Sequence, residues 1–447
     1  MKKIVILGAA ESGVGAAILA QKQGFDVFVS DHSAIRPQYK ALLDAHHLRW
    51  EETQHTEEEI LSATEVIKSP GIPDTVPIMQ KVIAAGIPVI SEIEFAARYT
   101  NAKMVCITGS NGKTTTTSLI YHIFRTAGID AGLAGNIGHS LALQVAEQPH
   151  EVYVIELSSF QLDNMYQFRA NIAVLLNITP DHLDRYDFKM QNYIDAKMRI
   201  IQNQTADDAF IYWADDPVVT RELPKYPLPH QRYAFSEKQQ AGAQGYTANG
   251  TYQLEGPTPF AMPQQELALR GRHNIYNQLA AGLAANIFGI DHEAIRKGLK
   301  TFPGVEHRLE FVCETDGIEY INDSKATNVD ACYYALEAMT RPTILILGGL
   351  DKGNDYSEII PLVKEKCAGL VYLGVDNKKL HDNFDALGLP VADTQSMQAC
   401  MDACRKMAKP GQTILLSPCC ASFDLFKNME DRGEQFKALA TQNVPNA

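Results

Sequence analysis

The stretch Thr108-Gly109-Ser110-Asn111-Gly112-Lys113-Thr114 decides the fold of the middle of this chain. It lies between an apolar strand predicted over Met104–Thr108 and a helix predicted over Thr114–Ala127, whose apolar side chains recur every three or four residues. Glycines in such a loop let backbone N–H groups surround a phosphate, and the helix N-terminus adds partial positive charge. The stretch therefore predicts a phosphate-binding loop at the edge of a parallel sheet.

The loop is a shortened P-loop, because Ile107 stands where the usual pattern has its first glycine and Gly109 closes the loop instead. Lys113 can reach the β- and γ-phosphates of a nucleotide, and the Thr114 hydroxyl can ligate Mg²⁺. A glycine turn capped by asparagine, with a solvated lysine, is the alternative interpretation. The predicted nucleotide contacts are Gly109, Ser110, Asn111, Gly112, Lys113, Thr114 and Thr115.

Two polar side chains follow the next strands of this module. Glu156 ends the apolar strand Val152–Ile155, where a lone carboxylate is costly to bury unless a cation neutralises it. His182 follows the strand Ile172–Ile178 and should lie near the same sheet edge, where ligands gather. We predict a Mg²⁺ ligand at Glu156, against a carboxylate paired with a local serine or lysine. Position alone leaves His182 either catalytic, metal-binding or structural.

Lys197 lies in a helix predicted over Gln191–Ile201, with apolar residues three or four positions away on nearly the same face. A lysine on an apolar stripe must extend to solvent, pair with an acid, or change its chemistry. A buried lysine with a lowered pKa can react with CO₂ to give a carbamate, an anion able to bridge metal ions. Periodicity alone favours the solvent-reaching alternative.

Both ends of the chain alternate strands with helices, a pattern that predicts parallel sheets. The N-terminal strands are expected at Lys3–Leu7 and Asp26–Ser30, and the stretch 205–270 is expected to add short antiparallel strands at one edge of the central sheet. The C-terminal strands are expected at Ile318–Asn322, Thr343–Leu347, Leu370–Gly374 and Thr413–Leu416. We predict an α/β protein of three domains, each around a largely parallel sheet: Rossmann-like over 1–96, P-loop ATPase-like over 97–303 and Rossmann-like over 304–447.

Composition excludes several classes of function. The 40 Lys and Arg residues against 53 Asp and Glu residues give a net charge of −13, which argues against a nucleic-acid partner. No stretch approaches the roughly 18 apolar residues of a membrane span, and the apolar run after the N-terminal methionine is too short for a signal peptide. The eight cysteines show neither a disulfide framework nor zinc-like spacing, so we expect a cytoplasmic protein.

A set of motifs in fixed order resembles the Mur ligases of peptidoglycan synthesis. The motifs are TGSNGKTT (108–115), GNIG (135–138), ELSSFQL (156–162), TPDHLDRY (179–186), YIDAKMRI (193–200), GRHNIYN (271–277), EHRLE (306–310), NDSKATN (322–328), LGGLDKG (347–353) and SPCCASFDLF (417–426). Each motif is weak by itself, whereas the ordered set is specific and runs from the second domain to near the C-terminus. The motifs SPCCASFDLF and ELSSFQL resemble those of the Mur ligase that adds D-glutamate.

The resemblance implies an ATP-dependent ligase that joins D-glutamate to the L-alanine carboxylate of UDP-N-acetylmuramoyl-L-alanine through an acyl phosphate. It implies two Mg²⁺ ions, the first held by Thr114 and Glu156 and the second near His182 and a carbamate on Lys197. Lys113, His182, Lys197 and Asn136 are then the candidate catalytic residues. The resemblance assigns Asn274, Asn277, Arg308 and Asp323 to ATP, and Asn136, Ser158, Lys325, Thr327, Lys352, Ser417 and Phe423 to the substrates.

Several of these residues also have plainer roles. Asn136 suits a glycine-rich turn, Asn274 a helix N-cap, Arg308 an inter-domain salt bridge, and Phe423 core packing. Ser417 is expected to end a strand and open a helix, so that backbone N–H groups could hold a carboxylate.

The first domain departs from a dinucleotide fingerprint. The turn after the first strand has Ala10 where the fingerprint has its second glycine, which argues against NAD. The resemblance implies that this edge holds the uridine diphosphate end of the substrate, although Glu11 is a surprising charge there and Ser33 replaces an arginine that relatives can carry. Our candidates for this end are Ser12, Asp31, Ser69 and Gly71, with a strand-end turn as the alternative role for Asp31.

Three other functions remain open. The first is another ligase of the same superfamily, such as a folate polyglutamate ligase, which SPCCASFDLF disfavours. The second is an oxidoreductase on the N-terminal fold, which Ala10 disfavours. The third is a nucleotide-dependent switch without chemistry, which Glu156, His182 and Lys197 together disfavour.

Overall fold

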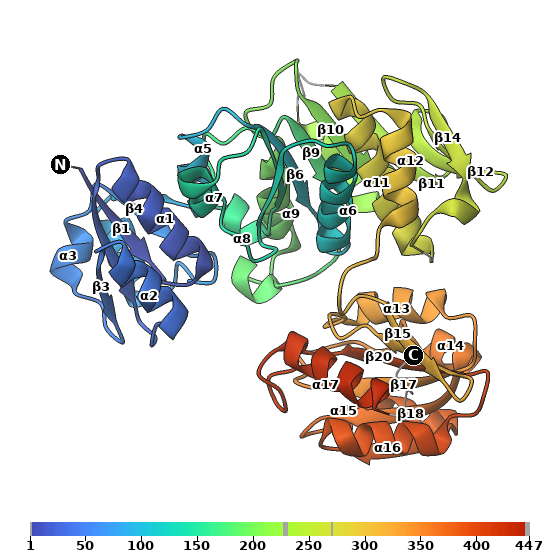
Figure 1. Ribbon diagram of the computed structural model, residues 1–447. Helices are drawn as coiled ribbons and strands as arrows, with labels where there is room; N and C mark the ends of the chain where they lie inside the picture. Colours follow the sequence, from blue (N-terminus) through green and yellow to red (C-terminus); the bar gives the residue numbers. More distant parts are fainter. Residues whose placement is uncertain (1, 227–230, 270, 443–447) are drawn as a thin grey trace. The chain divides into compact units, whose positions relative to one another are not determined.

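A computed structural model describes residues 2–226, 231–269 and 271–442. Its strands form three sheets, of five, nine and six strands in chain order, with helices packed on them (Figure 1). The chain thus has the three-domain α/β fold that the sequence predicts. The first two sheets share one compact unit with residues 276–302, whereas residues 271–275 and the third sheet form another. The limits 97 and 304 stay predictions.

The N-terminal sheet is fully parallel in the order β3-β2-β1-β4-β5, as expected for a Rossmann-like domain. Alternate residues of β1 face opposite ways: Ile4 and Ile6 pack with α1 and α2, and Val5 and Leu7 pack with α3 and α4. The elements are β1 (Lys3–Leu7), α1 (Glu11–Lys22), β2 (Asp26–Asp31), α2 (Pro37–Ala45), β3 (Arg49–Glu52), α3 (Glu57–Leu61), β4 (Glu65–Lys68), α4 (Pro77–Ala84), β5 (Val89–Ile90) and α5 (Glu92–Ala97).

The central sheet has the order β14-β13-β12-β11-β10-β9-β6-β8-β7. Its parallel part places the carboxyl ends of β6, β8 and β9 side by side. Strands β12, β13 and β14 pair antiparallel at one edge, which confirms the expectation for 205–270. The strands are β6 (Lys103–Thr108), β7 (Ala131–Gly135), β8 (Val152–Glu156), β9 (Ile172–Leu175), β10 (Ala209–Trp213), β11 (Gln231–Lys238), β12 (Ala243–Ala248), β13 (Thr251–Leu254) and β14 (Phe260–Pro263).

The helices of this part pack around the parallel strands (Figure 1). They are α6 (Lys113–Thr126), α7 (Leu141–Glu147), α8 (Ser159–Leu162), α9 (Met190–Met198), α10 (Pro217–Glu222), α11 (Arg272–Phe288) and α12 (His292–Thr301). Short 3₁₀ turns are η1 (Leu183–Tyr186), η2 (Arg199–Ile201), η3 (Leu223–Lys225) and η4 (Gln264–Glu266). The helix predicted over Gln191–Ile201 is thus α9 followed by η2.

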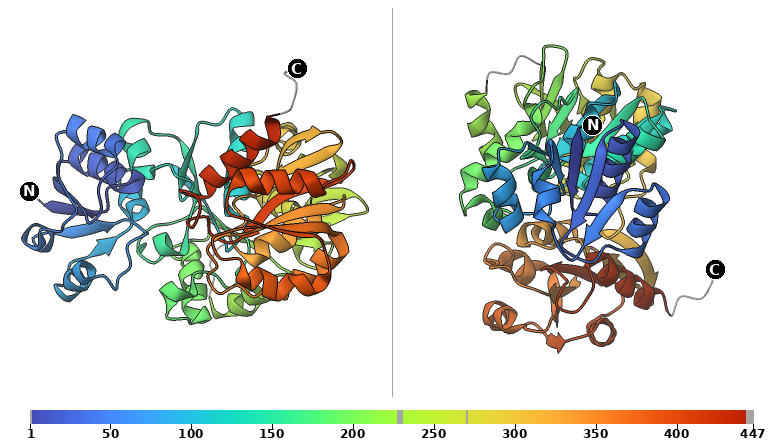
Figure 2. Two further views of the ribbon diagram at one scale, coloured as in Figure 1. Left: turned by 90° about the horizontal axis from the view of Figure 1, so that it is seen from below. Right: turned by 90° about the vertical axis from the view of Figure 1, so that its left-hand side faces the viewer.

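The C-terminal sheet has the order β15-β16-β20-β17-β18-β19, parallel except for β15. Helices cover both of its faces (Figure 2): α13, α14 and α15 pack on one, and α16 and α17 on the other. The elements are β15 (Glu310–Thr315), β16 (Ile318–Asn322), α13 (Val329–Ala338), β17 (Thr343–Gly348), α14 (Ile360–Lys366), β18 (Cys367–Leu373), α15 (Lys378–Phe384), η5 (Asp385–Leu387), β19 (Val391–Thr394), α16 (Met397–Met407), β20 (Thr413–Cys419) and α17 (Met429–Thr441).

The end of β20 corrects one expectation. Ser417 does not open a helix, because β20 continues through it to Cys419 and the next helix, α17, begins only at Met429. The physical reason is Pro418, since the residue before a proline is driven away from the helical conformation and towards an extended one.

No helix in the described parts of the chain combines the length and apolar character needed to cross a membrane. All eight cysteines lie in those parts, and each carries a free thiol.

Candidate active site

The predicted phosphate-binding loop joins β6 to α6, so the strand–loop–helix prediction is confirmed. Gly112 caps α6 in the left-handed region, with φ +83°. A Cβ atom on Gly112 would lie 2.3 Å from Oδ1 of Asn277, which comes from α11. Glycine is therefore required at this position both by the backbone conformation and by the close approach of Asn277.

Lys113 folds back over the loop from the first position of α6. Its Nζ donates to the carbonyl oxygens of Gly109 and Ser110, each at 2.8 Å. Thr114 and Thr115 follow in the first helical turn and are buried. The ammonium group thus lies over the loop, where a phosphate group could replace the two carbonyls as its partner.

Asn177 holds the loop from the neighbouring strand, and the sequence analysis missed it. Its Oδ1 accepts from the backbone N–H groups of Ser110 at 3.0 Å and Asn111 at 2.8 Å, and its Nδ2 donates to the Asn111 carbonyl at 3.1 Å. Ser110 also shares a hydrogen bond of 3.1 Å between its Oγ and the hydroxyl of Tyr193. The signal in the sequence was an asparagine just beyond β9, the strand that pairs with β6 and so ends beside the loop.

Glu156 lies at the carboxyl end of β8, next to the loop strand. Asn136 holds one of its carboxylate oxygens, because Asn136 Nδ2 donates to Glu156 Oε1 at 2.7 Å. The other oxygen, Oε2, is buried and makes no hydrogen bond within the described part of the chain. A buried carboxylate oxygen without a protein donor is suited to a cation, so Glu156 fits the predicted Mg²⁺ site.

Lys197 is 1 % exposed, so the solvent-reaching alternative is wrong. Its Nζ donates to the Gly109 carbonyl at 2.7 Å, the same oxygen that Lys113 contacts, and lies 4.7 Å from the centre of the Tyr193 ring. Burial and then the nearby Lys113 charge lower the pKa of Lys197 well below its usual value, against the charges of Asp181 and Glu156. These two causes favour the neutral, nucleophilic amine.

His182 lies beyond this cluster in a different setting. It stands at φ +51° before η1 and its side chain is 48 % exposed. Its Nε2 lies 3.6 Å from Asp181 Oδ2, and its ring meets the edge of Phe160 at 5.2 Å between centroids. The cluster therefore joins Lys113, Glu156 and Lys197, with the charge of Asp181 nearby, and the catalytic or metal role of His182 stays a prediction.

Two further candidates near the loop have structural contacts. Ser158 caps α8 in a reciprocal capping box with Gln161, which gives its side chain a structural role. Asn277 accepts from Thr116 Oγ1 at 3.2 Å and lies against the loop, as a nucleotide contact would require. Asn274, near the start of α11, is also buried, and its assignment to ATP stays a prediction.

The N-terminal candidates lie at the carboxyl edge of their sheet. Asp31 uses both carboxylate oxygens to hold turns, accepting from Ala9 N at 2.7 Å and from Ser33 N at 2.8 Å. Ser69 follows β4, and its buried Oγ has no hydrogen-bond partner in the described residues. Ser12 lies in the first turn of α1 and Gly71 in the turn after β4. The strand-end role of Asp31 is confirmed, and the uridine assignment stays a prediction.

In the second unit, Asp323 is the central buried acid. Ser417 Oγ donates to its Oδ2 at 2.9 Å and the Leu309 N–H to its Oδ1 at 3.2 Å. Burial raises the pKa of Asp323 to about 7, although these bonds and the Arg308 charge oppose the shift. Asp323 and Ser417 are thus brought together, with Arg308 near enough to act on the Asp323 charge.

The remaining candidates for the amino-acid substrate lie on loops of the same unit. Lys325 and Thr327 follow Asp323 in a turn in which Thr327 N donates to the Lys325 carbonyl at 2.9 Å. Lys352 is exposed beyond β17, and Phe423 is 67 % exposed beyond β20. Core packing is therefore wrong for Phe423, whose ring is available to a ligand.

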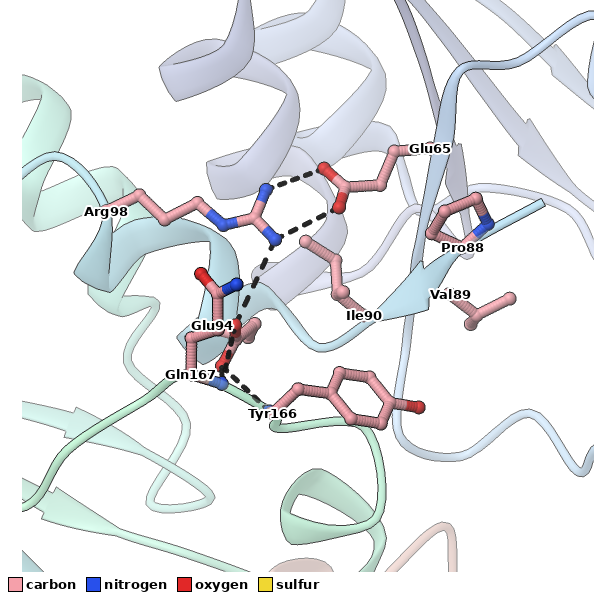
Figure 3. A pocket seen from close by; sticks show the side chains of 8 residues that line it. All are labelled: Glu65, Pro88, Val89, Ile90, Glu94, Arg98, Tyr166 and Gln167. Atoms are coloured by element: carbon pink, nitrogen blue, oxygen red, sulfur yellow. Dashed lines mark hydrogen bonds and ion pairs between the residues drawn. The ribbon is translucent and has the colours of Figure 1, made fainter. Parts of the chain in front are cut away.

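A pocket of about 260 Å³ lies elsewhere, between β5, α5 and the segment around Tyr166 (Figure 3). Arg98 bonds both carboxylate oxygens of Glu65, at 2.7 and 3.0 Å. Glu94 accepts from the backbone N–H groups of 166–168. These polar groups satisfy one another, so we assign the pocket no part in the site.

Comparison with known proteins identifies the class. Residues 2–91 match the MurD-like N-terminal domain of Mur ligases, residues 107–285 the Mur ligase middle domain, and residues 307–420 the Mur ligase glutamate ligase domain. The chain therefore belongs to the Mur ligase family.

Curated relatives point to one member of that family. The chain is 65 % identical over 438 residues to the UDP-N-acetylmuramoylalanine–D-glutamate ligase of Bacteroides thetaiotaomicron, covering 98 % of this chain and 99 % of the relative. It is 55 % identical to the enzyme of the same name from Porphyromonas gingivalis strain W83, over 97 % of both chains.

Solved structures support the fold alone. The UDP-N-acetylmuramate–alanine ligase of Thermotoga maritima is 17 % identical, with a TM-score of 0.64 over 99 % of both chains. A pseudomurein peptide ligase type C from Methanothermus fervidus is 19 % identical, with a TM-score of 0.63 over 99 % of this chain and 100 % of the other.

Proposed function

We propose that this chain is the D-glutamate-adding Mur ligase, which joins D-glutamate to the L-alanine carboxylate of UDP-N-acetylmuramoyl-L-alanine and converts ATP to ADP and phosphate as the amide forms. It acts in the cytoplasm, in the synthesis of peptidoglycan precursors. Two relatives of that name, 65 % and 64 % identical over 98 % of this chain, support this substrate pair. The observation that carries the chemistry is the cluster of Lys113, Glu156 and Lys197 around one phosphate-binding loop.

The reaction has two steps. The L-alanine carboxylate attacks the γ-phosphate of ATP, which gives an acyl phosphate and ADP. The amine of D-glutamate, after losing a proton, then attacks the acyl carbon, and phosphate leaves as the amide forms. Phosphorylation is needed because a free carboxylate has no adequate leaving group, so the protein mainly positions the reactants and neutralises charge.

The loop residues hold the nucleotide. Loop N–H groups bind phosphate oxygens, and Lys113 exchanges its two loop carbonyls for the β- and γ-phosphates. Mg²⁺, when bound, neutralises developing phosphate charge, and the residues that fit it are Thr114 and Glu156. Asn136 occupies Oε1 of Glu156, which leaves Oε2 for the ion.

Lys197 is proposed to act as a carbamate. Its neutral amine attacks CO₂, a C–N bond forms, one proton leaves to solvent, and the side chain becomes an anion. That anion would provide the ligand for a second Mg²⁺, near His182. The support is the near-complete burial of Lys197 and its position beside Lys113, which both lower its pKa.

The function is tested by phosphate release from ATP and Mg²⁺ with UDP-N-acetylmuramoyl-L-alanine, adding D-glutamate, L-glutamate or neither. Release that requires D-glutamate and yields the extended UDP-sugar supports the proposal. Release with a different amino acid would keep the ligase chemistry and overturn the substrate. Absence of release under all conditions, despite ATP binding, would favour the nucleotide switch.

The carbamate has a separate test. Lys197→Ala should lower turnover at least 100-fold, and formate or acetate should restore part of it by supplying the missing carboxylate. Lys189→Ala, which removes an exposed lysine just before the same helix, is the control. Activity of Lys197→Ala equal to that of the control would contradict the carbamate.

A further inference from the structure

Arg432 is an arginine buried in α17, with only 1 % of its surface exposed. Its guanidinium makes three hydrogen bonds: Nε to Ser324 Oγ at 3.0 Å, Nη2 to the Ser324 carbonyl at 2.8 Å, and Nη1 to the Cys420 carbonyl at 3.1 Å. None of these three acceptors is a carboxylate. The side chain therefore binds two chain segments, not one acid.

The two segments carry the candidates for the amino-acid substrate. Ser324 stands between Asp323 and Lys325 in the turn after β16, and Cys420 directly follows β20, between Ser417 and Phe423. These segments, 322–328 and 417–426, are 108 and 12 residues from Arg432 in sequence at their contact points. Only the folded C-terminal unit brings them onto one guanidinium.

Ser324 also contacts the first residue of helix α17. Its hydroxyl, which accepts from Arg432 Nε, donates to the carbonyl of Met429, the first residue of α17. The turn after β16 is thus fixed to α17 at two points. Because the guanidinium is planar, its three donors also fix the direction of the Cys420 carbonyl relative to Ser324.

Burying the charged Arg432 guanidinium costs desolvation free energy, which an apolar side chain at this position would avoid. Burial lowers the pKa of Arg432 to about 10, so the group is still protonated at neutral pH. Its hydrogen-bonded partners are neutral, and the nearby charges of Asp424 and Asp323 favour the protonated guanidinium against burial.

We propose that Arg432 is the positioning residue of the amino-acid site, which holds segments 322–328 and 417–426 at the spacing that D-glutamate binding requires. This inference rests on the proposed function. Arg432 acts through the segments and does not contact the substrate itself.

The test compares Arg432 with a matched arginine. Arg405 lies in α16, is partly buried, and donates to the carbonyl of Leu439 in the same helix α17, away from both segments. We would prepare Arg432→Lys, Arg432→Ala, Arg405→Lys and Arg405→Ala in the full chain. KM for D-glutamate, KM for UDP-N-acetylmuramoyl-L-alanine and the melting temperature would be measured for each.

Arg432→Lys is expected to raise KM for D-glutamate at least tenfold and to leave KM for the UDP-sugar within twofold. The Arg405 variants should keep both KM values within twofold of wild type. Guanidinium ions at non-denaturing concentration should partly restore the KM for D-glutamate in Arg432→Ala, because they can reoccupy the space and make the same bonds.

Equal KM values for D-glutamate in Arg432→Lys and Arg405→Lys would overturn the inference, as would a uniform rise for both substrates. Should Arg432→Ala fail to fold, Arg432→Lys decides the question alone. A wild-type enzyme that uses a different amino acid would overturn the proposed substrate. The same comparison, run with that amino acid, would still support or refute the role of Arg432.

Discussion

Replacing Asn177 by alanine should weaken nucleotide binding, although Asn177 itself is not among the residues that we assign to the nucleotide. The side chain makes three hydrogen bonds to the backbone of the phosphate-binding loop, at 2.8–3.1 Å. At about 0.5–1.5 kcal/mol net for each, their loss should destabilise the ordered loop by about 2–3 kcal/mol. Part of the free energy of nucleotide binding must then be used to order the loop, which lowers the affinity for ATP.

A tenfold change corresponds to 1.4 kcal/mol, so the dissociation constant for ATP should rise roughly 30- to 150-fold in Asn177→Ala. Titration calorimetry with a non-hydrolysable ATP analogue measures this constant directly, whereas KM equals it only when chemistry is slow. The KM for D-glutamate should change little, because its candidate residues lie in the other unit.

Asn171 provides the matched control. It directly precedes the same strand, β9, and so lies at the amino end of the strand, opposite to Asn177. Its Oδ1 accepts from Met104 N at 2.9 Å, and its Nδ2 donates to Asp208 at 3.3 Å. Asn171→Ala should lower stability and leave ATP affinity unchanged. If the two variants bind the analogue within twofold of each other, Asn177 does not order the loop for nucleotide.

Three further substitutions follow from single features of the structure. Gly112→Ala places a side chain at φ +83° and 2.3 Å from Asn277, so ATP affinity should fall at least tenfold, whereas Gly128→Ala, at φ +78° with open space, should only lower the melting temperature. Glu156→Gln keeps an acceptor oxygen but loses the charge, so the Mg²⁺ concentration for half-maximal activity should rise at least tenfold; an unchanged Mg²⁺ titration would exclude Glu156 as a ligand. Burial raises the pKa of Glu92 from 4.5 to about 7, so the folded state binds this proton more tightly than the unfolded state does. The free energy of unfolding should therefore fall by roughly 3 kcal/mol as pH rises through that window. Urea denaturation between pH 5 and 8 should show a smaller fall in Glu92→Gln than in the wild type.

Local sequence patterns predicted the parts of the site that lie within one strand, loop and helix. Strand β6, the loop and α6 follow one another in the chain, so periodicity and glycine positions were sufficient. The carboxyl ends of β8 and β9 lie at the same side of the sheet as predicted, because the strands are parallel, although β9 ends at Leu175 and not at Ile178. Glu156 was predicted from that rule together with the cost of burying a lone carboxylate at the end of an apolar strand.

Long-range contacts could not be found in this way. Asn177 and Ser110 are 67 residues apart, and Tyr193 and Ser110 are 83 apart, so no local pattern connects them. The burial of Lys197 depends on the packing of α9 against the loop, and periodicity alone favoured exposure. For Ser417, the local signal was read wrongly, because Pro418 extends the strand where a helix start was expected.

The Gly109 carbonyl explains how two lysines of one site can have different chemistry. Both Nζ atoms contact this oxygen, Lys113 at 2.8 Å and Lys197 at 2.7 Å, so two ammonium charges would repel each other across one acceptor. Lys113 also has the Ser110 carbonyl and lies in a half-buried position, whereas Lys197 is almost fully buried. The cost of a second charge therefore falls on Lys197, the residue whose proposed reaction requires a neutral amine.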